Sequence, residues 1–254
     1  MKEYGISTSL TLIFQWCIIH AEVIDLYKTE LHAHTCPASK CAHTEPEEMI
    51  EQYIENGYSA VVITNHMSPT LFDVILPDIT DYKEAAEIFL EDIRRARVYA
   101  AGRITVLTGM ELRVRKNMND YLIYGIDDEF ILNMGNVMDM TIKELSPFFH
   151  ENGALIFQAH PFRDTMTVTS PKLLDGIEAG NFCTTHDSRN DIAAVWAKKF
   201  GMLTVYGSDY HSKAYMRGAG ILTEQPITCN AELLNVLKTK SFKVTDGENV
   251  FLPY

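Results

Sequence analysis

The chain has 254 residues, of which 46% are hydrophobic and 22% charged, and this fits a globular protein with a core that needs no disulfide staples. Its formal net charge of −12 at pH 7 disfavours a long nucleic-acid partner, because such a partner binds basic surfaces. The five cysteines are odd in number, which argues against a disulfide framework and favours a reducing cytoplasm.

The N-terminal segment contains a mostly apolar run at residues 6–19. Glu3 offsets Lys2, Gln15 interrupts the run, and no good cleavage site follows, so we do not expect a signal peptide. The run is also too short and too polar to span a bilayer. We expect a strand or helix packed on the domain, within an N-terminal extension at residues 1–26.

From residue 26 onwards, short apolar runs alternate with helical patterns. The predicted strands are 26–31, 60–64, 104–112, 121–126, 154–159, 176–179, 202–206, 219–223 and 242–245. The predicted helices are 44–57, 81–101, 141–153, 189–200 and one that Asn230 would cap. Thr44 with Glu47, and Thr141 with Glu144, have the spacing of capping boxes.

This alternation predicts an α/β fold with a mostly parallel sheet and helices outside it. A run of about seven or eight strands favours a closed or distorted barrel. A doubly wound open sheet is the alternative. The sequence has no Gly-x-Gly-x-x-Gly or P-loop motif that would favour a nucleotide fold.

Five of the nine histidines lie at or just past the carboxyl ends of predicted strands: His32, His34, His66, His160 and His211. In α/β folds this edge carries the active site. Residues two apart on an extended segment point to the same side, so His32 and His34 can reach one metal ion, and Asp209 and His211 repeat that spacing.

Glu111 lies among apolar strand residues, where a carboxylate is costly unless it is paired. A buried salt bridge to Arg113 or Arg115 is one interpretation. A carboxylate that bridges two cations is the other, and the surrounding histidines favour it.

Six segments occur in order between residues 30 and 211: ELHAHT, VITNH, GMELRV, QAHPFR, GIEAGN and GSDYH. Through them the chain resembles the polymerase-and-histidinol-phosphatase (PHP) family of metal-dependent phosphoesterases. The resemblance implies a distorted (β/α)7 TIM-like barrel, with residues 27–254 as a single PHP-type catalytic domain. It also implies a site for two or three divalent ions.

The resemblance implies one ligand set for each ion. His32, His34, Glu111 and Asp209 would hold the first ion, Glu111 and His160 the second, and His66 and His211 the third. The family usually adds a histidine or aspartate shortly after the His-x-His pair, but position 40 is a lysine here. Cys41 or His43 could substitute for it, and Asp120 is a candidate for a further family position.

Other residues near these segments have less specific patterns. Arg163 could hold a phosphate oxygen or be an ordinary surface arginine, and Lys213 and Arg217 could line the mouth of the site. Glu178 and Asn181 could orient the ligating histidines. Cys36, Cys41 and His43 could instead belong to a structural zinc site. The remaining histidines fit no ligand position: His20, His150 and His186.

The resemblance and the residues together predict hydrolysis of small phosphate esters by a two-metal mechanism. Glu111, His211 and Arg163 are the predicted catalytic residues, with Zn, Mn or Fe as the ions. A nuclease, an amidohydrolase-like hydrolase and a non-catalytic metal-binding regulatory domain are the alternatives. We expect no long nucleic-acid partner and no membrane.

Overall fold

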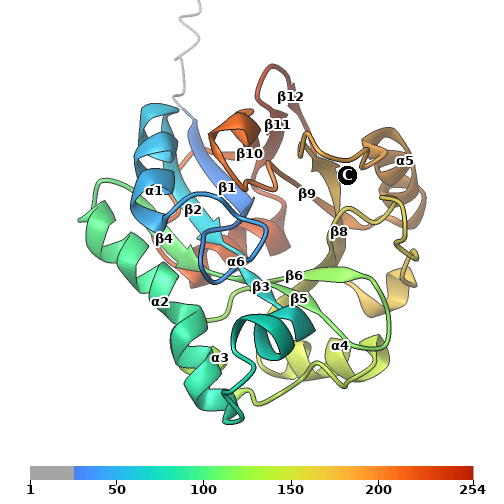
Figure 1. Ribbon diagram of the computed structural model, residues 1–254. Helices are drawn as coiled ribbons and strands as arrows, with labels where there is room; N and C mark the ends of the chain where they lie inside the picture. The colour runs from blue at the N-terminus through green and yellow to red at the C-terminus, as the bar shows by residue number, and fades with distance from the viewer. Residues whose placement is uncertain (1–25, 254) are drawn as a thin grey trace, which may run out of the picture.

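The computed structural model describes residues 26–253, which form strands surrounded by helices (Figure 1). The predicted extension at 1–26 lies almost wholly outside the described residues. The strands are β1 (Tyr27–Ala33), β2 (Tyr58–Ile63), β3 (His66–Met67), β4 (Thr105–Thr108), β5 (Met110–Arg113), β6 (Asp120–Tyr124), β7 (Leu155–Gln158), β8 (Gly176–Asn181), β9 (Leu203–Gly207), β10 (Ala219–Thr223), β11 (Lys243–Asp246) and β12 (Val250–Phe251). The helices are α1 (Pro46–Glu55), α2 (Tyr82–Ala100), α3 (Asp128–Asn133), α4 (Ile142–Glu151), α5 (Asn190–Phe200) and α6 (Asn230–Thr239), with short helical turns η1 (Leu71–Ile75), η2 (Pro171–Leu173) and η3 (Lys213–Tyr215).

The strands form two six-stranded sheets, in the orders β12-β11-β10-β1-β2-β4 and β3-β5-β6-β7-β8-β9. Five strand pairs are parallel and five are antiparallel, so the prediction of a mostly parallel sheet is wrong. A parallel pair needs a crossover of a dozen or more residues. The short segment 114–119 between β5 and β6 cannot supply one, and the chain turns back instead.

The two sheets meet where β1 passes β9. Ala33 and Tyr210 form an isolated parallel bridge, and the His34 N–H donates to the Tyr210 carbonyl at 2.8 Å. The Tyr210 N–H donates in turn to the His32 carbonyl at 3.1 Å. The described strands do not form a closed sheet, so the seven-stranded barrel stays a prediction.

The predicted strand at 104–112 is in fact two strands that belong to different sheets. β4 pairs with β2 in the first sheet and β5 pairs with β3 in the second, with Gly109 between them. A Cβ atom at Gly109 would lie 2.7 Å from Val62 Cγ1, so only glycine allows the chain to pass this close to β2. The bend places Glu111 opposite His66 in the register of β3 and β5.

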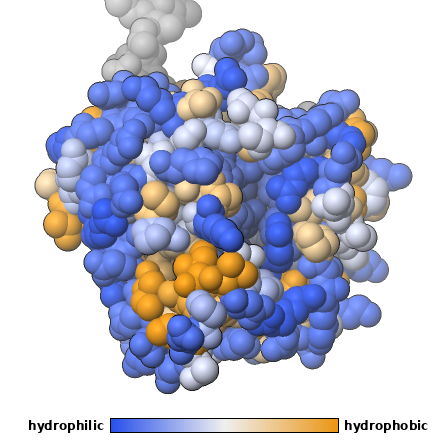
Figure 2. All heavy atoms as spheres, in the orientation of Figure 1, coloured by the Kyte–Doolittle hydropathy of each residue, from blue (hydrophilic) through white to orange (hydrophobic). Residues whose placement is uncertain are grey.

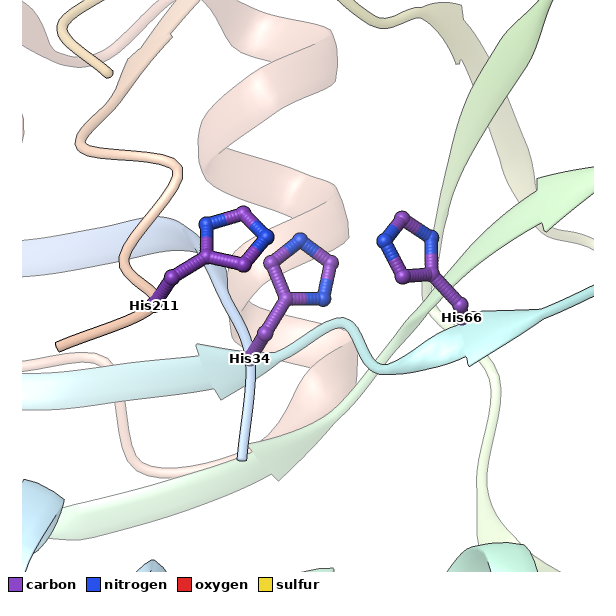
Figure 3. A group of neighbouring side chains, drawn as sticks. All are labelled: His34, His66 and His211. Carbon is purple, nitrogen blue, oxygen red and sulfur yellow. The ribbon is translucent and has the colours of Figure 1, made fainter. Parts of the chain in front are cut away.

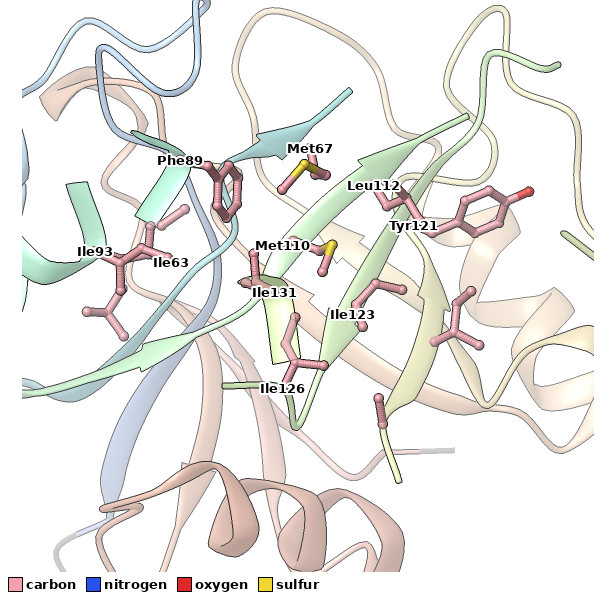
Figure 4. Close-up of a cluster of buried hydrophobic side chains, with 14 of the residues drawn as sticks. Ile63, Met67, Phe89, Ile93, Met110, Leu112, Tyr121, Ile123, Ile126 and Ile131 are labelled. Carbon is pink, nitrogen blue, oxygen red and sulfur yellow. The ribbon is translucent and has the colours of Figure 1, made fainter. Parts of the chain in front are cut away.

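Most strands other than β12 are buried on both faces, and alternate residues pack in different clusters. Ile63, Met110 and Ile123 of the strands pack in one cluster with Phe89 and Ile93 of α2 (Figure 4). Side chains from both sheets and from α6 form a second cluster: Leu31, Val62, Leu107, Leu122, Phe157, Val205, Leu233 and Leu237. Leu31 of this cluster directly precedes His32 in β1.

The helix ends agree only in part with their predicted caps. Thr141 and Glu144 form the expected capping box of α4. α1 has no capping box, because Pro46 occupies its first turn and Glu47 pairs with Arg95 of α2. Asn230 does not cap α6, since its side-chain amide donates to the Ile126 carbonyl. In residues 26–253, no helix is both long enough and apolar enough to cross a bilayer.

Candidate metal centre

The structure brings together all seven residues that the sequence predicts as metal ligands. His32 and His34 lie at the end of β1, His66 begins β3, and Glu111 lies in β5. His160 follows β7, and Asp209 and His211 follow β9. The interpretation of Glu111 as the salt-bridge partner of Arg113 or Arg115 is wrong, because Arg113 pairs with Asp120 and Arg115 with Asp73. Both arginines are therefore engaged away from Glu111.

The centre of the cluster is a group of buried donor atoms that face one another at 3 to 4 Å. His32 Nε2 lies 3.5 Å from Glu111 Oε2 and 3.4 Å from Asp209 Oδ1. His34 Nε2 lies 3.3 Å from each of the same two oxygens. His160 Nε2 lies 3.1 Å from Glu111 Oε1. These spacings match those between ligands that share one ion with bonds of about 2.0–2.2 Å.

Several of these atoms have no hydrogen-bond partner although they are buried. They are His32 Nε2, His34 Nε2 and Glu111 Oε2. Buried polar atoms are normally satisfied, and an unsatisfied one costs about 1–3 kcal/mol. Imidazole nitrogens and carboxylate oxygens that are unsatisfied and converge are the donor set of a divalent transition-metal ion, so the residues fit such an ion.

A second group of imidazoles lies beside this centre. Figure 3 shows the rings of His211, His34 and His66 next to one another, with His34 in the middle. The ring centroids of His34 lie 4.4 Å from His66 and 4.6 Å from His211. Ligand atoms of the three lie within 4.8 Å of one another, so they could also hold an ion.

Glu178 and Asn181 support the ligands from behind, in agreement with the sequence-based expectation. Glu178 Oε1 accepts from His32 Nδ1 at 2.8 Å, and Oε2 accepts from the His160 backbone N–H at 3.0 Å. Asn181 Nδ2 donates to Glu178 at 2.9 Å and to Asp209 at 3.1 Å. Because a carboxylate can only accept, His32 carries its proton on Nδ1 and directs Nε2 into the centre.

Glu30, which the sequence patterns did not predict as a site residue, links β1 to the end of β9. Its carboxylate accepts from the backbone N–H groups of Leu31, His32 and Ser208, and from the hydroxyls of Ser208 and Tyr53. Five donors replace the water that burial removes. Glu30 therefore holds the His32 and Asp209 segments at a fixed separation.

Two ligand candidates have a backbone conformation that L-residues rarely adopt. φ is 27° at His160 and 50° at Asp209. Left-handed conformations cost about 1–2 kcal/mol for a residue other than glycine, and such strain clusters at functional sites. The hydrogen bond from His160 N–H to Glu178 helps to hold one of them in place.

The buried carboxylates and imidazoles of the cluster shift one another's pKa values. Burial opposes ionisation of Glu111, but His66 and His32 outweigh it and hold its pKa well below its ordinary value. The pKa of Asp209 is likewise well below its ordinary value, because His32, His34 and His211 outweigh burial. Burial and the neighbouring His66 and His211 lower the pKa of His34 well below 6.5. Burial has the same effect on His32 and His66, but the carboxylates beside them outweigh it and raise the pKa of both rings well above 6.5.

Comparison with known proteins identifies the family. The family model described as the PHP domain matches residues 30–214. The chain belongs to the PHP domain family. No curated protein matches it by sequence.

Three solved structures share the fold of this PHP domain. One is a two-domain protein from Bacteroides vulgatus ATCC 8482 that contains a predicted PHP-like metal-dependent phosphoesterase; it is 15% identical with a TM-score of 0.61, and the match covers 87% of this chain but 65% of that one. PsfC from Pseudomonas syringae PB-5123 is 15% identical with a TM-score of 0.59, over 82% of this chain and 87% of PsfC. An amidohydrolase from Chromobacterium violaceum with bound sulfate and no metal is 16% identical with a TM-score of 0.51, over 87% of this chain and all of that one.

The cluster of this PHP domain opens into a pocket of about 440 Å³. Arg163, Arg113 and Lys40 line it, whereas Lys213 and Arg217 do not, contrary to expectation. Arg113 makes a paired contact with the Asp120 carboxylate, and Arg163 Nη2 lies 3.3 Å from it. Asp120 is thus engaged by two guanidinium groups and is not a free ligand. The pocket combines a cationic wall with the metal cluster.

Part of the pocket lining is apolar. Leu71 and Ile75 of η1 line it. Val74 of the same turn is 52% exposed, and Figure 2 shows hydrophobic atoms gathered in this region of the face, where Figure 1 draws the short turn η1.

His186 fits no ligand position in the sequence and lies in the loop between β8 and α5, yet this loop brings it to the pocket. It lines the pocket, its ring meets that of His160 edge-on at 5.5 Å, and its Nε2 is buried and lies 3.9 Å from Asp209 Oδ2. Burial lowers its pKa to about 4, so the ring is neutral at physiological pH. His150 is outside the site as expected, paired with Asp175, and His20 lies outside the described residues.

Cys41, and not His43, lies next to the outer imidazoles, which are those of His66 and His211. Both residues are exposed, but Cys41 Sγ lies 3.1 Å from His211 Nε2. Burial opposes the thiolate, but hydrogen bonds with His211 and His66 lower the pKa of Cys41 to about 6. Cys36 pairs with Glu45 instead, and among the described residues no group of three ligand atoms within 4.8 Å of one another includes Cys36, Cys41 or His43. The structural zinc alternative therefore has no support in this part of the chain.

Proposed function

We propose that this PHP domain is a metal-dependent phosphoesterase that hydrolyses small phosphate esters through two or three divalent ions. One observation carries the proposal: buried, unpartnered imidazole and carboxylate atoms converge at the base of a pocket with cationic side chains. The two-domain relative contains a predicted PHP-like metal-dependent phosphoesterase, which supports the same chemistry.

The ligand sets follow from the donor atoms. His32 and His34 with Asp209 and Glu111 would hold the first ion. Glu111 and His160 would hold the second, with Glu111 as the bridging carboxylate. His66 and His211 would hold the third. The mixture of nitrogen and oxygen donors suits Zn, Mn or Fe better than Ca.

Bound ions would supply Lewis acidity and make a water molecule acidic enough to attack phosphorus near neutral pH. The protein's own groups then position the ester. Arg163 would donate to a phosphate oxygen from the pocket lining, with Arg113 and Lys40 adding positive charge. His211 would deliver a proton to the leaving oxygen where the third ion is absent, since its Nε2 faces the pocket rim.

The shape of the pocket favours a small substrate. A phosphate near Arg163 leaves the leaving group beside the apolar wall of Leu71 and Ile75. A long nucleic acid would meet the −12 charge along its whole backbone, whereas a small ester meets only the local field within a Debye length of about 8 Å.

We further propose that residues 27–254 form one PHP-type catalytic domain in the cytoplasm. In this proposal the two sheets are the halves of a distorted seven-stranded barrel. The contacts between the ends of β1 and β9 support it, because they join the edge strand β9 of the second sheet to β1 of the first.

The test is a panel of phosphomonoesters, nucleotides, short single-stranded DNA and RNA, and amide substrates, each with added Mn²⁺ or Zn²⁺. We expect the phosphomonoesters to react fastest. Arg163→Ala should lower kcat/KM by about 10- to 100-fold, the value of a hydrogen bond to a charged group. Lys213→Ala is the matched control, because Lys213 lies outside the pocket lining.

Other outcomes decide between the alternatives. Faster cleavage of polynucleotides that Glu111→Ala abolishes would establish a nuclease. Faster amide hydrolysis would establish an amidohydrolase. Metal binding without turnover of any substrate would favour a regulatory domain.

A further inference from the structure

Cys41 lies at the pocket rim in the loop between β1 and α1, with its sulfur directed at an imidazole. Sγ is 3.1 Å from His211 Nε2. His211 Nδ1 lies 2.7 Å from the Asp209 carbonyl oxygen, which can only accept, so Nδ1 carries the proton. Nε2 therefore presents its lone pair beside the sulfur. The ring of His66 lies 6.4 Å from that of His211, centroid to centroid.

The loop that carries Cys41 is tied to both imidazole-bearing segments. The His43 N–H donates to the His211 carbonyl at 2.9 Å. On the other side of Cys41, Ser39 Oγ accepts from the His66 N–H at 2.9 Å. These two bonds fix the loop on either side of Cys41, so its position beside His66 and His211 is built into the fold.

His66 and His211, the outer pair of imidazoles, offer too few ligand atoms to form a metal site by themselves. His34 Nδ1 faces Ser39 Oγ at 3.3 Å, so this ring offers only Nε2. That nitrogen lies 3.3 Å from both Glu111 and Asp209, in the central group. When the central ion takes His34, the outer pair keeps one nitrogen each from His66 and His211. A catalytic zinc site has three protein ligands, so this pair lacks one. Lys40, which precedes Cys41 in the loop, is a cation and cannot supply it.

We propose that the thiolate of Cys41 is the third ligand of an outer metal site formed with His66 and His211. This inference rests on the proposed metal centre. The thiol proton passes to solvent as the sulfur–metal bond forms. A soft sulfur donor makes this site prefer zinc-like ions to Mg²⁺ and Mn²⁺.

The geometry allows this with a small displacement. Tetrahedral bonds of about 2.3 Å to sulfur and 2.0–2.1 Å to nitrogen separate the two ligand atoms by about 3.5 Å. The sulfur and nitrogen are 3.1 Å apart here, so a shift of less than about half an ångström admits the ion.

Cys183 is the rival thiol in the same pocket. Its sulfur belongs to a group with Asp209 and His211 whose ligand atoms lie within 4.8 Å of one another. However, that sulfur is hydrogen-bonded to Thr185 Oγ1 at 3.2 Å, and no second imidazole completes the group. A Cys183 variant is therefore a matched control for Cys41.

The test loads the metal-free full-length chain with Co²⁺ and records its absorption spectrum and metal content. Thiolate-bound cobalt gives a near-ultraviolet charge-transfer band that imidazole and carboxylate ligands do not give. We expect the band in the wild type and in Cys183→Ser, and its loss in Cys41→Ser. Cys41→Asp should restore the third ligand without the band, and should shift the outer site towards Mn²⁺ in competition with Zn²⁺.

A band that survives in Cys41→Ser, or that disappears equally in Cys183→Ser, would overturn the assignment. Cobalt bound to the wild type without any band would also overturn it, while leaving the proposed metal centre intact. A chain that binds no cobalt at all would overturn both. Circular dichroism of each variant shows whether the fold is retained.

Discussion

Glu178 acts on two candidate ligands from the side away from the pocket. One oxygen fixes the proton of His32 on Nδ1, and the other holds the strained backbone at His160. Gly207 permits this arrangement, because a Cβ atom there would lie 2.6 Å from His32 Cβ and 3.1 Å from Glu178 Oε1. The direction of the ligating nitrogen is therefore set by residues that do not themselves face the substrate.

Glu178→Gln tests this positioning role. The amide offers an NH₂ group where one of the two donors, His32 Nδ1–H or His160 N–H, now finds an acceptor. We expect Zn²⁺ affinity to fall by about 10- to 100-fold, as for other partners that orient metal ligands. Competition with a chelator measures this. The exposed variant Glu55→Gln should bind as the wild type does, and equal affinities in all three proteins would refute the role.

A residue of the site could be predicted from the sequence only where a sequence pattern marks its position. The seven proposed ligands were found because they follow apolar strands, where α/β sites lie. Glu30 shares a strand face with His32 and His34, two and four residues on, and that spacing could have revealed it. His186 lies in an irregular loop after β8, where only the tertiary fold brings it to His160. No periodicity marks such a position.

At the scale of elements, the chain changes sheets twice at the same level. β2 gives way to β3 at Thr64 and Asn65, and β4 gives way to β5 at Gly109. The Gly109 N–H donates to the Ile63 carbonyl and the Glu111 N–H to the Asn65 carbonyl, which continues the contact across the break. In the apolar run 104–112, only Gly109 marks the break between β4 and β5. Sequence periodicity therefore predicted a single strand. The break is nevertheless what brings Glu111 to His66.

A charged network joins three elements near that break, and Asp128→Asn tests its contribution. Asp128 of α3 accepts from Thr108 at 2.7 Å and from Arg97 of α2 at 2.8 and 2.9 Å. Burial raises the pKa of Asp128, but Thr108 and Arg97 outweigh it, so the pKa is below its ordinary value. The network therefore stabilises the folded state above the unfolded pKa of about 3.9, and loses this effect as pH falls through the lower, folded value.

We expect Asp128→Asn to lower the free energy of unfolding by about 1–2 kcal/mol at pH 7, and by much less near pH 3. Urea unfolding at both pH values measures the difference. Asp78→Asn, at an exposed position after η1, is the control. A loss for Asp128→Asn that is the same at both pH values would show that hydrogen-bond geometry, and not charge, carries the effect.

At the scale of the whole molecule, the α/β alternation and the converging strand ends followed from the sequence, but the division into two sheets did not. Strand ends can be read from periodicity, whereas the direction of pairing depends on connection lengths and on sheet edges that no single segment specifies. The same assembly collects carboxylates and imidazoles from both sheets into one buried cluster. An ion held there would therefore join the two halves of the fold.

Metal binding should consequently stabilise the whole domain. An ion that binds only the folded state adds about 2.7 kcal/mol at a hundredfold excess over its Kd. For a chain of this size each kcal/mol shifts Tm by about 2–4 °C, so Zn²⁺ or Mn²⁺ should raise Tm by about 5–10 °C over the chelated protein. Differential scanning calorimetry measures the shift. Glu111→Gln removes the carboxylate shared by both central ions and should show a much smaller rise, while Glu55→Gln should match the wild type. If Tm of the wild type does not respond to either ion, the buried donors are held by the fold alone and the metal centre is refuted.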